Sequence, residues 1–484
     1  MINVFILLYL NLFMSQKNET KILALTLLLT VGIVGGSVWW FTNNGVKIGN
    51  NITQNPETGS NPSLQDRISF GEKTLTPGDI SPVKKEGVQA IAAKSYDKAI
   101  ANFTAALKLN RNDPETLIFL NNARIGSSKS YTTVASVPFG TDPNASLEIL
   151  RGIAQAQNEI NTSGGVKGVL LKIGIANDDD NPAIAKQIAS SLASNSEVLG
   201  LVGPNTSDST LAAGTIYTSG QLVAISPTST SVKISNFSRY VFRTVPSDFM
   251  AARSLANYMV RTLQKKNAVV FFNSQSNYSQ SLKSEFVSSV SLEGGQVSSE
   301  FDLSQVGFSA AKSIEQATKQ GAEVLMLAAN TETLDKALQV IQINQKKLTL
   351  LAGDDVYTAK TLEIGREQAV GMVLAVPWHI NGAPKSDFPQ KSRQLWGGDV
   401  SWRSALSYDA TVALIAALER NPTRYGVQQA LFSSDFSATG ASGTIRFLGS
   451  GDRNAPVQLV KIVPGSRSGT GSRSGTGYDF EPVR

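Results

Sequence analysis

Hydroxyl side chains crowd two loops that each follow a short aliphatic run. Ser207 lies in VLGLVGPNTSDST, and Thr228, Ser229 and Thr230 lie in LVAISPTSTSVKI. Hydroxyls and backbone N–H groups at a strand end or a helix N-terminus form a neutral, directional receptor for a carboxylate or a similar anion. Simple helix capping and turn formation by the same residues is the alternative interpretation.

Two further loops carry groups suited to the rest of a small molecule. LTLLAGDDVY puts Asp354 and Asp355 after another aliphatic run, where a carboxylate could face a ligand cation. Tyr278, in FFNSQSNYSQSL, is suited to covering a bound molecule. The single histidine, His379, is interpreted as an ordinary surface or hinge residue.

The composition excludes several kinds of chemistry. The chain has 484 residues, no cysteine and one histidine. This removes thiolate zinc sites, Fe–S clusters, cysteine nucleophiles and two-histidine metal motifs. We therefore expect no metal, no cofactor and no enzymatic activity. A net charge of +6 spread over this length does not indicate a nucleic-acid partner, because such proteins concentrate Lys and Arg into patches.

The loops belong to a region, from about residue 131 to 463, in which short aliphatic runs alternate with segments of helical period. Strands that are apolar throughout and separated by helices are typical of parallel sheets covered on both faces. The pattern predicts an α/β fold with two doubly wound lobes. Ligands of such sheets bind beyond the carboxyl ends of the strands, where these loops lie.

The N-terminus predicts a membrane anchor. Residues 22–41 are uncharged and mostly apolar, long enough to span a hydrocarbon core of about 30 Å, and they end in Trp39-Trp40 without a small-residue cleavage site. We expect residues 1–21 to be cytoplasmic and the rest extracytoplasmic, with a cleaved signal peptide as the alternative. If translation starts at Met14, residues 1–13 are not made.

Three segments complete the predicted organisation. Residues 42–82 are rich in Asn, Gly, Ser, Thr and Pro, which predicts a flexible linker. Residues 83–126 predict a small all-α module whose spacing, including Gly87 and Phe103, matches one tetratricopeptide repeat, with a third helix over 114–124. A helical spacer packed on its neighbour and a module that docks a protein partner are both open. Residues 464–484, in which GSRSGT occurs twice in tandem, predict a low-complexity tail.

In order and spacing, the main region resembles the leucine/isoleucine/valine-binding proteins, the periplasmic binding protein type I components of ABC importers. The motifs that carry the resemblance are GIAQAQNEINTSGGVKG, NDDDNP, VGPNTSDST, ISPTST, YVFRTVPSD and LLAGDDVY. The resemblance implies a two-lobed binding domain over 127–463, which closes around its ligand by rotation about a hinge. Lobe 1 would hold residues 131–245 and 377–445, and lobe 2 residues 246–376 and 446–463. The chain would cross between the lobes near Val245–Pro246, Val376–Pro377 and Ile445–Phe447.

The resemblance also assigns roles to individual residues. Ser207 and Thr230 fall where the family binds an amino-acid carboxylate, and Thr228 replaces an alanine whose backbone takes part. Asp355 falls on the acidic residue that holds the ligand ammonium, and Tyr278 on an aromatic residue that closes over the ligand. The departures are Asp355 itself, one methylene shorter than the usual Glu, Ala145 and Ser146 in place of a tyrosine, and Asn330 in place of an aromatic residue.

These departures predict a polar pocket, so a polar amino acid, an amide or urea-like solute, and a ligand unconnected with transport are all open. The function we expect is a membrane-anchored extracytoplasmic receptor that delivers an amino acid or related small polar solute to an ABC permease. The alternative is a periplasmic sensor or scaffold that recruits a protein partner through residues 83–126.

Overall fold

The computed structural model describes residues 63–382, 386–465 and 474–483. The predicted anchor at 22–41 and most of the predicted linker lie outside these ranges. Within the ranges, no helix combines the length and the apolar character needed to cross a membrane.

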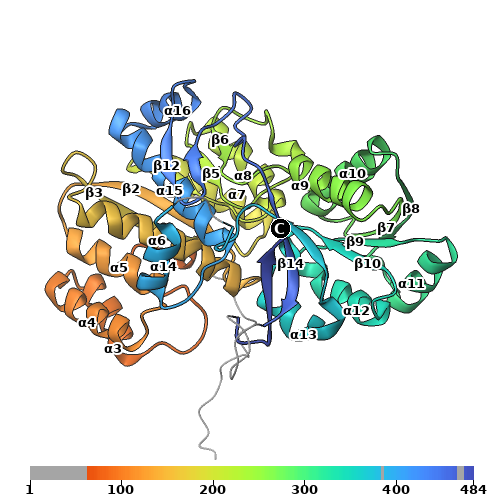
Figure 1. The fold of residues 1–484 in the computed structure, drawn as a ribbon. Coiled ribbons are helices and arrows are strands. Elements are labelled where there is room, and N and C mark those ends of the chain that lie inside the picture. The colour runs from red at the N-terminus through yellow and green to blue at the C-terminus, as the bar shows by residue number, and fades with distance from the viewer. Residues whose placement is uncertain (1–62, 383–385, 466–473, 484) are drawn as a thin grey trace, which may run out of the picture. The chain divides into compact units, whose positions relative to one another are not determined.

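The first lobe is built on a six-stranded sheet with the order β1-β3-β2-β4-β5-β6 (Figure 1). Strands β2 to β6 run parallel, while β1 pairs antiparallel with β3 at one edge. The strands are β1 (Ile68–Ser69), β2 (Ser130–Val137), β3 (Leu170–Asn177), β4 (Val198–Val202), β5 (Ala224–Ser226) and β6 (Val241–Arg243). The helices of this lobe include α6 (Pro143–Thr162), α7 (Pro182–Ser194), α8 (Ser207–Ser219), α14 (Phe388–Trp396), α15 (Trp402–Arg420) and α16 (Arg424–Phe432).

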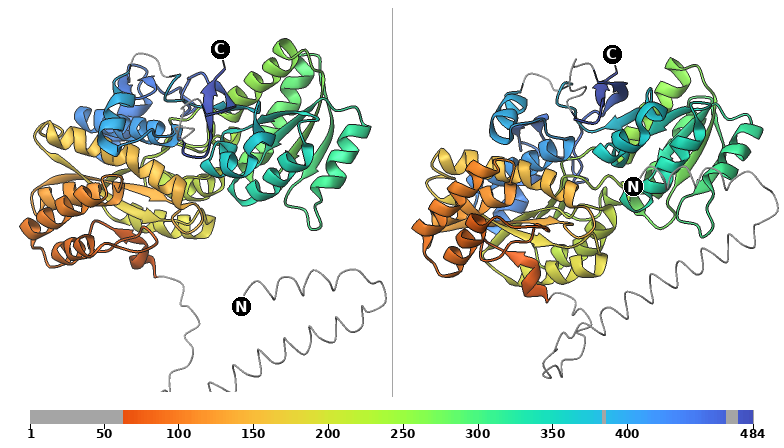
Figure 2. Two further views of the ribbon diagram at one scale, coloured as in Figure 1. Left: turned by 60° about the horizontal axis from the view of Figure 1, so that its bottom comes forward. Right: turned by 90° about the horizontal axis from the view of Figure 1, so that it is seen from below.

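The second lobe lies at the right of both views in Figure 2. It holds a seven-stranded sheet with the order β15-β14-β11-β10-β9-β7-β8. Its strands are β7 (Asn267–Phe272), β8 (Gln296–Asp302), β9 (Val324–Ala328), β10 (Thr349–Ala352), β11 (Val373–Val376), β14 (Gln458–Pro464) and β15 (Tyr478–Pro482). Its helices are α9 (Asp248–Asn257), α10 (Asn277–Leu292), α11 (Ala310–Lys319), α12 (Leu334–Asn344) and α13 (Ala359–Ala369). A two-stranded ribbon, β12 (Ala438–Gly440) and β13 (Gly443–Ile445), lies beside α15.

Burial explains why the aliphatic runs form these strands. Every residue of β5, β9 and β11 is buried, as expected for central strands with helices on both faces. The alternation of such strands with amphipathic helices produces parallel pairing in both lobes, and the two-lobed α/β prediction is confirmed.

The structure corrects the predicted linker over residues 63–81. Ile68 and Ser69 add a strand to β3, and Arg67 donates to Asp179 at 2.6 Å. The backbone N–H groups of Leu75 and Thr76 donate to the buried carboxylate of Glu115. The low average hydropathy of the segment concealed these few specific contacts, which bind it to the first lobe.

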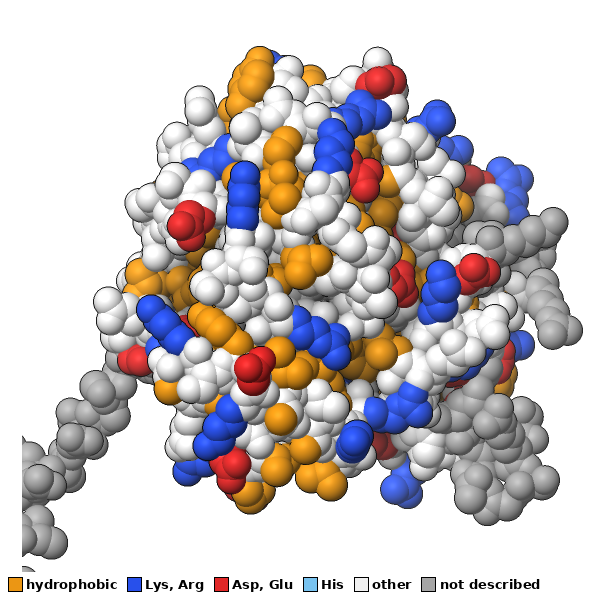
Figure 3. All heavy atoms as spheres, turned by 90° about the vertical axis from the view of Figure 1, so that its left-hand side faces the viewer, with side chains coloured by type: hydrophobic (Ala, Val, Ile, Leu, Met, Phe, Trp, Pro, Cys, Tyr) orange, Lys and Arg blue, Asp and Glu red, His pale blue; other side chains and the backbone are white. Residues whose placement is uncertain are grey.

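The predicted helical module forms α3 (Pro82–Ala92), α4 (Tyr96–Leu109) and α5 (Pro114–Ile125). A Cβ on Gly87 would lie 2.6 Å from the ring of Phe103, so this glycine permits the close packing of α3 on α4. Helix α5 is buried along most of its length and packs on α6 and β3, where Asn122 donates to the carbonyl of Ile173 at 2.7 Å. The module is thus attached to the first lobe. Figure 3 shows this side of the molecule, on which acidic and basic side chains are interspersed with apolar ones.

Two of the predicted crossings agree with the structure. The chain passes from β6 of the first lobe into α9 of the second lobe, and it returns from β11 of the second lobe to α14 of the first. His379, just after the second crossing, is buried and its Nδ1 accepts from the Asn381 N–H, so it is not a surface residue. The third crossing lies later than predicted. Phe447 packs on Phe242 of the first lobe with ring centroids 5.1 Å apart, and Asp452 pairs with Arg243 at 2.6 Å. The chain therefore crosses between Arg453 and Gln458.

The predicted tail also differs from the structure. Residues Tyr478–Pro482 pair with β14 as the last strand of the second sheet. Phe480 stacks on Tyr357 with centroids 4.1 Å apart, so the end of the chain carries a core contact that the repetitive sequence before it does not suggest.

Candidate ligand-binding cleft

The anion-binding part of the candidate site lies where β4 leads into α8. Gly203 directly follows this strand with a φ of +119°, and a Cβ there would lie 2.5 Å from the Ser136 carbonyl oxygen. Only glycine fits a positive φ at such close approach to another strand. The Thr206 side chain then caps α8 by accepting from the Ser209 N–H, which places Ser207 in the first turn of the helix.

The two hydroxyl-rich loops come together as predicted. The Ser207 hydroxyl accepts from the Ser231 N–H at 3.2 Å. The hydroxyls of Thr228 and Ser229 both donate to the Asn205 carbonyl, at 2.7 and 3.0 Å, so these two side chains serve the loop itself. Turn formation of this kind is the alternative interpretation given above for these hydroxyls.

Thr230 and Ser207 keep donors that the fold does not use. Within the described part of the chain, the backbone N–H groups of Ser207 and Thr230 have no acceptor. The buried hydroxyl of Thr230 makes no hydrogen bond of ordinary geometry with a described residue, but it lies close enough to the buried Asp248 carboxyl to lower the pKa of that group. Unused donors at a helix N-terminus suit a carboxylate.

The second lobe brings Tyr278, Asp354 and Asp355 together. The Tyr278 hydroxyl donates to Asp354 Oδ1 at 2.8 Å and accepts weakly from the Asp355 N–H at 3.4 Å. Tyr278 is therefore held against the aspartate pair. Burial raises the pKa of Asp354, although the Tyr278 hydroxyl and Arg403 act in the opposite direction.

Arg403, from the first turn of α15, ion-pairs with Asp355 at 3.0 Å. Its guanidinium also reaches the Tyr357 carbonyl at 3.4 Å and stacks over Trp402 at 4.4 Å. Burial raises the pKa of Asp355 to about 7; Arg403 lowers it, while Asp354 and Asp142 raise it further. Sequence reasoning missed Arg403, which lies 48 residues from its partner in no recognisable motif.

Three residues that depart from the family pattern, Asn330, Ala145 and Ser146, form hydrogen bonds with protein groups nearby. The Asn330 side-chain oxygen accepts from Asn273 at 3.0 Å and from Thr333 at 2.8 Å, so it is engaged within its own lobe. Ala145 and Ser146 are buried in the first turn of α6, where both bond to Asp142.

Hydrogen bonds join the two lobes at the rim of the site. Asp208 of α8 accepts from the side chain and backbone N–H of Asn277 at the start of α10, at 2.6 and 3.1 Å. The Val232 N–H donates to Ser281 at 3.0 Å, and Thr331 donates to Asp142 at 3.4 Å. Residues of both lobes thus surround the loops that carry Thr230 and Asp355.

Buried carboxyl groups are concentrated around the site. Burial raises the pKa of Asp178 to about 6 and of Asp248 to about 7, and it raises the pKa of Asp180 well above its ordinary value. Asp142 and Asp355 raise the pKa of Asp180 further, so carboxyl groups of the two lobes influence one another. No group of three or more metal-ligating side chains occurs among the described residues.

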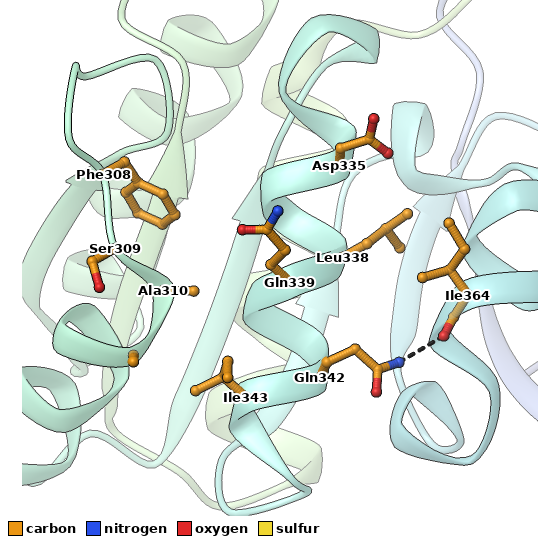
Figure 4. A pocket seen from close by; sticks show the side chains of 10 residues that line it. Phe308, Ser309, Ala310, Asp335, Leu338, Gln339, Gln342, Ile343 and Ile364 are labelled. Carbon is orange, nitrogen blue, oxygen red and sulfur yellow. Dashed lines mark hydrogen bonds between the residues drawn. The ribbon is translucent and has the colours of Figure 1, made fainter. Parts of the chain in front are cut away.

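A groove of about 690 Å³ lies elsewhere, between α11, α12 and α13 on the outer side of the second lobe (Figure 4). Phe308, Leu338, Ile343 and Ile364 line it, and Gln342 bonds across it to the carbonyl of Ile364. None of the predicted site residues lines this groove.

Comparison with known proteins agrees with this architecture. A family model described as periplasmic binding protein matches residues 139–469. The chain belongs to the periplasmic binding protein family. The family consists of solute-binding proteins with an extracytoplasmic location, and the prediction of a solute-binding protein that is not an enzyme is confirmed.

One relative of similar sequence matches part of the chain. An amino acid binding protein of Pseudomonas aeruginosa is 30% identical over 145 residues, which are 29% of this chain and 38% of that protein. The match thus spans well under half of the relative's length.

Among solved structures, an ABC transporter substrate-binding protein from Desulfitobacterium hafniense in complex with Leu has a TM-score of 0.62 at 22% identity, covering 73% of this chain and 100% of that one. A Rhodopseudomonas palustris solute-binding protein in complex with 3,4-dihydroxybenzoic acid has a TM-score of 0.63 at 14% identity, covering 73% and 96%.

Proposed function

We propose that this protein is the extracytoplasmic solute receptor of an ABC importer and that it binds the carboxylate of a small solute between its two lobes. The observation that carries this proposal is that the backbone N–H groups of Ser207 and Thr230 have no acceptor among the described residues. Buried donors without acceptors cost stability unless a ligand satisfies them, so the donor set favours an anionic group at the start of α8.

The ligands of similar proteins support the same chemistry. Four proteins of similar structure were solved with a bound ligand: Leu, isoleucine, 3,4-dihydroxybenzoic acid and 4-hydroxybenzoate. Their side groups differ, but each of these molecules carries a carboxylate.

We further propose that the receptor is held at the membrane across which its solute is taken up. Residues 22–41 anchor the receptor in the membrane, with residues 1–21 in the cytoplasm, and a shortened linker ends near residue 62. The binding domain delivers its solute to permease subunits in that membrane. As a second role, α3 and α4 dock a protein partner, which is supported by their position on the first lobe and by their repeat-like spacing.

The test is calorimetry on the full-length chain, preceded by a thermal-shift screen of amino acids and of aliphatic and aromatic acids. A ligand at 100 times its Kd stabilises the chain by about 2.7 kcal/mol. We expect Thr230→Val to weaken binding about 10- to 100-fold, because a hydrogen bond to a charged group contributes roughly 1.5–3 kcal/mol.

Thr215→Val, at an exposed position of the same helix as Ser207, is the matched control and should bind normally. If the chain melts cooperatively but no carboxylate in the screen stabilises it, the proposed receptor function is wrong.

A further inference from the structure

The acidic residue that the family resemblance assigns to a ligand ammonium already has a cation in this protein. Asp355 pairs with Arg403 at 3.0 Å, and the neighbouring Asp354 accepts from the Tyr278 hydroxyl at 2.8 Å. Asp355 therefore has a protein cation as its partner, and one oxygen of Asp354 accepts a hydrogen bond from a protein hydroxyl. The backbone N–H groups of Ser207 and Thr230, in contrast, are without acceptors among the described residues.

The position of Arg403 is fixed by the first lobe. The N-terminus of α15 is held on α6, because Glu148 accepts from the Ser401 N–H at 2.8 Å and from the Ser404 hydroxyl at 2.6 Å. Arg403 follows Trp402, over whose ring its guanidinium stacks. The Arg403 side chain is only 7% exposed.

A ligand ammonium at Asp355 would therefore meet a buried guanidinium. Arg403 already occupies the position beside Asp355 and repels a second cation there. This repulsion is strong where water is excluded, although Asp354 and Asp142 attract a cation. Displacing Arg403 instead would leave a buried charge without a partner, which is also unfavourable. A solute that presents a carboxylate to Ser207 and Thr230, with an uncharged group toward Asp355, avoids both costs.

We propose that Arg403 takes the place of a ligand ammonium at Asp355, so that the site selects small carboxylic acids without an α-ammonium group over the matching amino acids. This inference rests on the proposed function, and it makes Arg403 the residue that determines the charge class of the solute.

The test compares matched pairs that differ only at the α-carbon: leucine with 4-methyl-2-oxopentanoate, and phenylalanine with phenylpyruvate. Calorimetry on the full-length chain should give at least about tenfold tighter binding of the keto acid, which corresponds to about 1.4 kcal/mol. Arg403→Gln should reduce or reverse this preference, and Arg403→Lys should retain it. Arg393→Gln, on the exposed surface of α14, is the control and should leave the ratio unchanged.

The outcomes separate the two proposals. Tighter binding of the amino acid by the unmodified chain would overturn this inference alone and leave the receptor function standing. Binding of neither member of a pair, nor of any other carboxylate, would overturn the proposed function and this inference with it. The preference of the unmodified chain decides the matter even if an Arg403 variant fails to fold.

Discussion

At the scale of single residues, Asp248 has an unusual environment beneath the anion-binding loop. It is buried, its N–H donates to the Thr230 carbonyl, and the nearby Ser281 and Thr230 hydroxyls and Arg243 do not compensate for its loss of water. Its pKa is therefore about 7, against an ordinary value of 3.8. The folded state binds this proton more tightly than the unfolded state does.

This shift predicts a pH-dependent stability. Because the pKa is raised on folding, the contribution of Asp248 is complete below about pH 4 and is lost as the pH rises to 7, with a slope of at most about 1.4 kcal/mol per pH unit. Asp248→Asn should remove this loss, so urea unfolding should show the variant gaining stability relative to the unmodified chain from pH 5 to pH 8. Asp387→Asn, at an exposed position, should show no such trend. A constant difference across this range would contradict the assignment.

At the scale of elements, the contact between α6 and α15 supports the site. Gly152 of α6 lies directly against the Ser404 carbonyl and the Ser407 hydroxyl of α15, and a Cβ at this glycine would overlap both. The two helices therefore approach each other more closely than helices with larger side chains can. This approach brings Arg403 to the cleft.

Gly152→Ala should destabilise the protein by about 1–3 kcal/mol, the usual cost of overpacking a tight interface. Urea unfolding measures the change. Gly398→Ala is the matched control, since a Cβ there would meet nothing within 4 Å. Equal stability of the two variants would show that the helices separate freely.

The elements also show how far sequence reasoning reaches. Aliphatic runs predicted the parallel strands. The structure places Ser207 and Tyr278 in the first turns of α8 and α10, and Thr230 and Asp355 in the segments that follow β5 and β10. That these residues bind a ligand stays a prediction. Arg403 could not be found in this way, because its role depends on a helix packing against α6 rather than on a local pattern. Residues 63–81 and 478–482 were missed because a few specific contacts order segments whose composition suggests a linker and a tail.

At the scale of the whole molecule, the contact between Asp208 and Asn277 joins the two lobes. Because the two residues belong to different lobes, this contact forms only when the lobes meet. Groups that interact only in the closed arrangement change the fraction of molecules competent to retain a ligand.

Asn277→Ala should weaken binding of any solute about 2- to 10-fold, chiefly through faster dissociation, since most affinity changes among variants of one interface lie in the dissociation rate. Stopped-flow or surface-based kinetics can measure this rate. Asn257→Ala, at an exposed position at the end of α9, should leave it unchanged. An unaltered dissociation rate in Asn277→Ala would show that the lobes close without this contact.

The tandem GSRSGT repeat lies in the connection between β14 and β15, and the Gly465 N–H donates to the Gly477 carbonyl across its base. Deleting either copy yields the same sequence. A glycine then still stands at each end of the connection, where Gly465 and Gly477 now form the hydrogen bond. Halving such a connection changes its closure entropy by only about 0.6 kcal/mol. Removing one copy should therefore change the closure entropy of the connection that holds β15 beside β14 by only this small amount.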